Sequence, residues 1–92
     1  MKTIVLDGAE MLTKETAHAY LAARLALPDY YGNNLDALYD LMTDREEETV
    51  LVLGYWRQLG LLLGDYGISL LETLREASES HPKVEIILKE EL

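Results

Sequence analysis

The sequence predicts an α/β fold in which a three-stranded parallel sheet packs with about four helices. Three short apolar runs rich in β-branched residues alternate with segments whose apolar residues recur at helical spacing. Strands separated by helices indicate parallel strands joined by right-handed helical crossovers. The 92 residues, 49% of them hydrophobic, suit one small globular domain over residues 1–92.

The first strand is predicted from Lys2 to Leu6, where Thr3, Ile4 and Val5 are β-branched, and it ends at the turn pair Asp7-Gly8. Thr13 is a suitable N-cap for a helix that runs to about Leu25. Pro28 prevents this helix from continuing.

In the loop that follows, Gly32 is a residue that can adopt a positive φ. Asn34 is a good N-cap for a second helix from Leu35 to about Thr43. After a charged turn at residues 44–48, the apolar run from Val50 to Leu53 is typical of a strand buried on both faces.

The last third of the chain predicts two helices and a strand. A short helix is expected from Trp56 to Leu63, and the segment from Gly64 to Gly67 is expected to break it. A longer amphipathic helix follows from Ile68 to about Ser80 and stops at His81-Pro82. The final strand is expected from Val84 to Leu88.

Composition excludes several classes of function. The chain has no cysteine, so it has no disulfide framework, cysteine nucleophile or thiolate zinc site. Seventeen acidic residues against eight basic ones give a net charge of -9, which opposes binding to nucleic acid or anionic membranes and favours a basic partner. No signal peptide or transmembrane segment is evident, so we expect a cytoplasmic protein.

We find no pattern typical of an enzyme. His18 has no acid–base partner nearby in the sequence. His81 lies in a turn that ends a helix, where it is expected to interact with the last carbonyls of that helix, and structural roles are expected for both histidines. The chain has no glycine-rich phosphate loop and no nucleophile elbow. Asp36 and Asp40 could form an acid–base pair or hold a hard cation, but the spacing of a calcium loop is missing. We therefore expect no catalytic residue, metal or cofactor.

The segment from Leu27 to Asp40 carries the strongest functional signal. On its predicted helix, Leu35, Leu38, Leu41 and Met42 form the core side, while Asp36, Asp40 and Asp44 follow one another at four-residue steps on another face. Like charges at this spacing repel, and the last two lie near the negative end of the helix dipole. A sequence optimised only for stability would place basic residues there, although a charged run of this kind is usually just a solvated face.

Tyrosines beside these carboxylates indicate a protein interface. Tyr30 and Tyr31 are expected to be exposed in the loop, and Tyr39 lies within the acidic ridge. A row of carboxylates can replace the phosphates of a nucleic acid in the cationic site of a nuclease, where arginine binds a carboxylate in bidentate fashion.

This segment resembles the barstar family, the intracellular inhibitors of barnase-type extracellular ribonucleases. The pattern LP-x-YYG-x-NLDAL-x-D is present from Leu27 to Asp40, and the resemblance extends over essentially the whole chain through Trp56-Arg57-Gln58, Arg75-Glu76-Ala77 and Ile86-Ile87-Leu88. The resemblance implies a barstar-like fold and inhibition of a basic ribonuclease by helix-borne acidic residues that mimic phosphate.

The resemblance also implies roles for individual residues. Asp40 corresponds to the central carboxylate that enters the nuclease site, and Asp36 to a second acidic contact on the same helix. Tyr30 corresponds to a loop tyrosine that packs on the nuclease, and Glu76 to a peripheral acidic contact. The other implied contacts are at the start of the helix and along its contact stripe: Asn34, Leu35, Ala37 and Thr43.

Two departures from the family pattern concern the partner. Tyr39 stands where the family has a tryptophan, and Asp44-Arg45 replaces a glycine–aromatic pair. They leave the identity of the nuclease open. Alternatives are a toxin immunity protein, a barstar-like protein-binding or regulatory module without a nuclease target, and an acidic mimic that sequesters a DNA-binding protein. Acid spread along an extended face would favour the last, whereas 7 of the 17 acids lie between Asp29 and Glu48. A monomer is expected when the protein is free.

Overall fold

The structure, a computed structural model, describes all residues from 1 to 92. Its elements follow the order β-η-α-α-β-α-α-β, where η is a 3-10 helix. They are β1 (Lys2–Asp7), η1 (Gly8–Glu10), α1 (Lys14–Leu25), α2 (Leu35–Thr43), β2 (Thr49–Gly54), α3 (Gln58–Leu63), α4 (Asp65–Ser80) and β3 (Val84–Lys89). The predicted α/β class, with three parallel strands and four α-helices, is confirmed.

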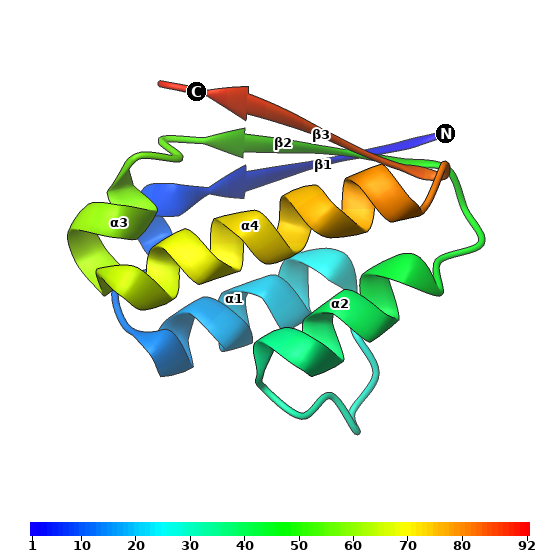
Figure 1. Cartoon of the computed structure of the whole chain (residues 1–92), viewed down its shortest axis with the longest axis horizontal. Coiled ribbons are helices and arrows are strands. Elements are labelled where there is room, and N and C mark those ends of the chain that lie inside the picture. Colours follow the sequence, from blue (N-terminus) through cyan, green and yellow to red (C-terminus); the bar gives the residue numbers. More distant parts are fainter.

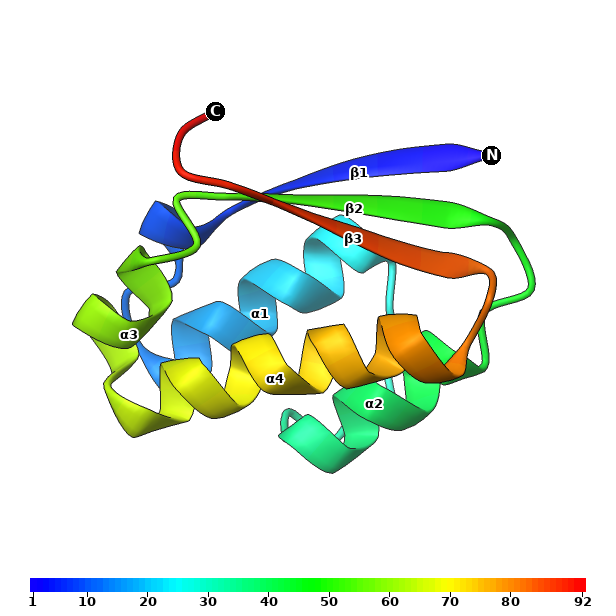
Figure 2. The same cartoon turned by 45° about the horizontal axis from the view of Figure 1, so that its top comes forward.

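The sheet has the strand order β1-β2-β3, and both pairings are parallel. Figures 1 and 2 show all four helices on one side of this sheet. The strand order explains this arrangement, because two successive crossovers of the same hand that step in the same direction lie on the same face.

The prediction that the middle strand is buried on both faces is therefore wrong. Leu51 and Leu53 point into the core and are fully buried, whereas Val50 and Val52 on the other face are only half-buried. The continuous apolar run reflects the central position of β2, which is flanked by a strand on each side, and not a second layer of helices.

The core fills the space between the sheet and the helices. Each helix contributes fully buried side chains, such as Leu21 of α1, Met42 of α2, Leu59 of α3 and Leu74 of α4. Helix α2 is held mainly by α4, and this pairing places α2 on the outer side of the helical layer (Figure 2). One side of α2 is consequently left open to solvent.

The predicted break between the last two helices is shorter than expected. Only Gly64, with φ of 62°, separates α3 from α4, which begins at Asp65 and not at Ile68. Gly67 does not break the helix. It lies inside α4, where an added Cβ would collide with the backbone carbonyl of Leu59 in α3. The glycine permits close packing of the two helices, a demand that the local sequence does not reveal.

No helix of the structure combines the length and the apolar character needed to cross a membrane.

Candidate functional site

The start of α2 is fixed by local hydrogen bonds. The Asn34 side chain accepts a hydrogen bond from the Ala37 amide at 2.8 Å, as predicted for an N-cap, and donates one to the Gly32 carbonyl at 3.2 Å. The positive φ of this loop is not at Gly32 but at Asn33, with a value of 53°. Asparagine tolerates this region better than most residues because its short side chain bonds locally. The loop is thereby joined rigidly to the helix.

The two loop tyrosines have opposite environments, and the expectation that both are exposed is wrong for one of them. Tyr30 is 81% exposed, whereas Tyr31 is only 8% exposed. The Tyr31 hydroxyl is hydrogen-bonded to Nδ1 of His18 at 2.5 Å, and Nε2 of His18 contacts the Tyr66 hydroxyl at 2.5 Å. Tyr31 therefore anchors the loop to α1, and Tyr30 is left free for a partner.

Burial shifts the pKa values of His18 and Tyr31. It lowers the pKa of His18 below 6.5, and the charge of Lys14 lowers it further. Burial also raises the pKa of Tyr31 to about 12, with a smaller contribution from Tyr66. His18 is thus held neutral, and its predicted structural role is that of a link between α1, the loop and α4.

The faces of α2 largely follow the predicted helical spacing. Leu38 and Met42 are fully buried, while Leu35 and Leu41 flank them and are half-buried. The predicted acidic residues, Asp36, Asp40 and Asp44, are exposed, and Asp44 is the C-cap of the helix. The acidic ridge is a solvent-facing surface of a helix anchored on its opposite side.

No cation of this chain neutralises the ridge. The ion pair of the structure joins Arg57 and Glu90, far from α2 in the sequence. Arg45, the only basic residue between Asp29 and Glu48, donates instead to the Leu25 carbonyl at 3.1 Å and to the Thr49 hydroxyl at 3.3 Å. It stabilises the negative end of α1. The carboxylates of Asp36 and Asp40 are consequently available to an external cation.

Tyr39 and Thr43 lie beside the ridge, but internal hydrogen bonds occupy their hydroxyl groups. The Tyr39 hydroxyl is 2.7 Å from Oγ of Ser80 in α4. Thr43 donates to the Tyr39 carbonyl at 2.9 Å, one turn earlier in the helix. Both side chains are half-buried, as are the predicted contact residues Leu35 and Ala37. These four can contribute partial surface to an interface, with Asp36 and Asp40 more prominent.

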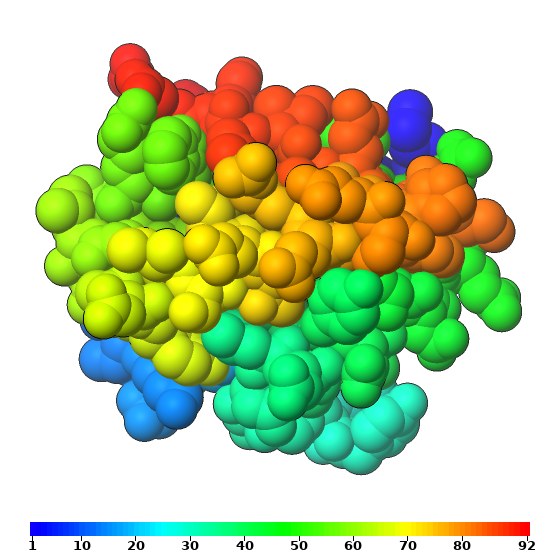
Figure 3. Space-filling view, in the orientation of Figure 1, coloured from blue at the N-terminus to red at the C-terminus, as the bar shows by residue number.

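Glu76 is exposed on α4, and it lies on the side of α4 that faces α2, one turn before Ser80. Figure 3 shows α2 and α4 side by side on one face of the molecule, α2 in green-cyan and α4 in yellow to orange. The sequence placed Glu76 and Asp40 in one site by resemblance alone. The packing of α2 on α4 provides the physical basis for that grouping.

Two residues that support the site were not predicted from the sequence: Tyr66, which contacts His18, and Ser80, which contacts Tyr39. The one available signal was the spacing of Ser80 four residues after Glu76, which places both on the same side of a helix. His81 was expected to interact with the last carbonyls of its own helix. Its Nε2 instead bonds to the Arg45 carbonyl at 2.7 Å.

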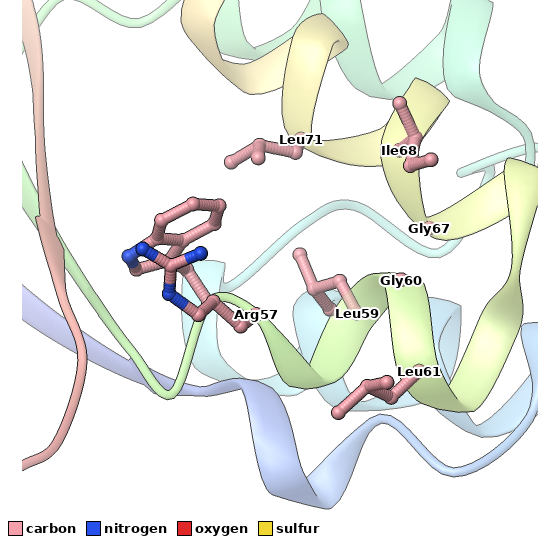
Figure 4. A pocket seen from close by; sticks show the side chains of 8 residues that line it. Arg57, Leu59, Gly60, Leu61, Gly67, Ile68 and Leu71 are labelled. Atoms are coloured by element: carbon pink, nitrogen blue, oxygen red, sulfur yellow. The ribbon is translucent and has the colours of Figure 1, made fainter.

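An apolar groove of about 360 Å³ lies between α3 and α4 (Figure 4). Its lining includes Trp56, Leu59, Ile68 and Leu71, and its one titratable side chain is Arg57, which stacks on Trp56. It therefore offers no general acid or base. No group of three or more His, Cys, Asp and Glu side chains is arranged to hold a metal ion.

Comparison with known proteins identifies the family of the chain. A family model described as Barstar (barnase inhibitor) matches residues 1–89. A protein of Bacillus subtilis (strain 168) named "Putative ribonuclease inhibitor YrdF" is 39% identical over 80 residues, which cover 86% of this chain and 88% of the relative. The family match covers both α2 and α4. The chain therefore belongs to the barstar family.

Proposed function

We propose that this protein inhibits a barnase-type ribonuclease by covering its cationic active site with α2. The main support for this proposal is that Asp36 and Asp40 lie one turn apart on the exposed side of α2 with no cation paired to either. Family membership and the name of the 39% identical relative support a ribonuclease as the partner.

Phosphate mimicry is the mechanism that this chemistry favours. A ribonuclease site holds phosphates with arginine, lysine and histidine donors, and a carboxylate presents two acceptor oxygens to the same donors. Helix α2 is anchored by the fully buried Leu38 and Met42, so the backbone that carries the two carboxylates is fixed before binding. Little conformational entropy is then lost when they enter the site.

Tyr30 supplies the apolar part of the proposed interface. It is 81% exposed in a loop whose next residue, Tyr31, is anchored to His18. An exposed aromatic ring on a fixed loop buries a large area at low entropic cost. Asn34, Leu35, Ala37, Tyr39, Thr43, Asp44 and Glu76 would complete the contact area around Asp36 and Asp40.

The net charge of -9 adds a kinetic advantage. A basic nuclease is attracted over distances comparable to the Debye length, and this steering raises the association rate. We place the inhibition in the cytoplasm of the producing cell, where it would protect that cell from its own nuclease or from the nuclease domain of a toxin. The free inhibitor would act as a monomer, because the same charge repels a second copy.

A titration of ribonuclease activity tests the proposal. A barnase-type enzyme cleaving a fluorescent RNA substrate should lose activity in proportion to added protein until the two are equimolar. A ribonuclease with an unrelated fold serves as the control and should keep its activity. Full activity of several barnase-type enzymes in the presence of excess protein would contradict the proposal.

A further inference from the structure

Tyr39 joins α2 to α4 through its hydroxyl group. Its hydroxyl lies 2.7 Å from Oγ of Ser80, which is 41 residues later in the chain. The Ser80 hydroxyl in turn lies 2.7 Å from the backbone carbonyl of Glu76. The three groups form a continuous hydrogen-bonded chain from one helix to the other.

The donor and acceptor roles in this series of hydrogen bonds follow from the number of protons available. A serine hydroxyl has a single proton, and a carbonyl oxygen can only accept. The Ser80 proton is therefore directed at the Glu76 carbonyl, and Ser80 must accept from Tyr39. The Tyr39 proton is used inside the molecule, so its phenolic oxygen faces the exterior only as an acceptor.

The surroundings of this oxygen are also acceptors. Tyr39 follows Asp36 by three residues, so the two side chains occupy neighbouring positions on the surface of α2, and the exposed Asp40 is the next residue of the helix. The Ser80 contact brings the same hydroxyl next to the turn of α4 that carries Glu76. This set of groups suits a ligand that only donates, such as a guanidinium or ammonium group, and disfavours a carbonyl or carboxylate.

We propose that Tyr39 is a specificity residue whose hydroxyl, oriented by Ser80, accepts a hydrogen bond from an arginine or lysine of the partner. This inference rests on the proposed inhibitory function. Ser80 acts as a positioning residue that does not touch the partner. The acidic ridge attracts any cation, whereas the oriented acceptor selects a partner with a donor at this point.

Inhibition constants of matched variants test the role of the hydroxyl. Tyr39→Phe keeps the ring and removes the oxygen, and it should weaken inhibition of a barnase-type ribonuclease about 10- to 100-fold, the range expected for a hydrogen bond to a charged group. Ser80→Ala should weaken it less, and in the Tyr39→Phe background it should have no further effect. An inhibition constant of Tyr39→Phe within twofold of the parent would overturn the inference.

A double-mutant cycle separates recognition from a purely structural role. The arginines and lysines of the nuclease site are replaced one at a time by methionine, and each variant is titrated with the parent and with Tyr39→Phe. One nuclease variant should become insensitive to the loss of the hydroxyl. If every cycle is additive, the hydroxyl touches no cation and the inference is wrong.

A probe that needs no nuclease makes the inference independently testable. Hexa-arginine is titrated into the labelled free protein, and the amide chemical shifts of residues 36–40 and 76–80 are followed. Tyr39→Phe should bind at least threefold more weakly at these amides, whereas Glu85→Gln, on the face of the sheet away from the helices, should bind like the parent. Equal binding of hexa-arginine by Tyr39→Phe and the parent overturns the inference. If the parent binds hexa-arginine more tightly than Tyr39→Phe but inhibits no nuclease, only the proposed function is refuted.

Discussion

The Asp40 carboxylate makes no ion pair and accepts no hydrogen bond from its own chain, so replacing Asp40 by alanine should separate binding from stability. The carboxylate lies one turn from Asp36 and one turn from Asp44 in the half of α2 near its negative end. Each like-charge pair costs about 0.2–0.5 kcal/mol, and the helix dipole adds about 0.3–1 kcal/mol. Asp40→Ala should therefore raise the free energy of unfolding by roughly 1 kcal/mol.

Binding should change in the opposite direction. In the proposed complex, Asp40 is the counter-charge of buried cations, and truncating one member of such a pair costs about 2–5 kcal/mol. This corresponds to an inhibition constant about 30- to 5,000-fold higher. A gain in stability together with a large loss of inhibition is a combination that a general folding defect cannot produce.

The assay for Asp40→Ala pairs a ribonuclease inhibition titration with urea unfolding followed by Trp56 fluorescence. Glu85→Gln is the matched control, because it removes one negative charge from the opposite face of the sheet. The control should inhibit like the parent apart from a small loss of electrostatic attraction. Equal inhibition constants for Asp40→Ala and Glu85→Gln would refute phosphate mimicry by Asp40.

Tyr30→Ala should weaken inhibition by about 1–2 kcal/mol. It should leave urea unfolding unchanged, because the Tyr30 ring is 81% exposed. A loss of stability comparable to the loss of affinity would contradict the interface role of Tyr30. Raising salt from 50 to 500 mM should slow association about tenfold or more in stopped-flow experiments, with much less change in dissociation, and association rates independent of salt would exclude steering. Because burial lowers the pKa of His18 below the 6.5 of an unfolded chain, the folded state binds fewer protons, and stability should fall as the pH drops from 7 to 5. His18→Gln should reduce this dependence, and identical losses in parent and variant over that range would assign it to other groups.

Local rules predicted much of the fold because the relevant forces act between near neighbours in the chain. The Asn34 cap and the core side of α2 follow from hydrogen bonding and helical spacing over a few residues. The break at Gly64 was placed correctly, but its extent was not, because Gly67 is present for packing against α3. The burial of Tyr31 was also not predicted, because it depends on a hydrogen bond to His18, 13 residues away.

The sequence by itself determined the α/β class, the acidic ridge of Asp36 and Asp40 and the resemblance to the barstar family, because these depend on composition, periodicity and a local motif. The tertiary structure alone decided that every helix lies on one face of the sheet, since that follows from the strand order. It also decided that Arg45 turns away from the ridge and that Ser80 directs the proton of Tyr39. These contacts join residues 20 and 41 positions apart, and only the tertiary structure brings them together.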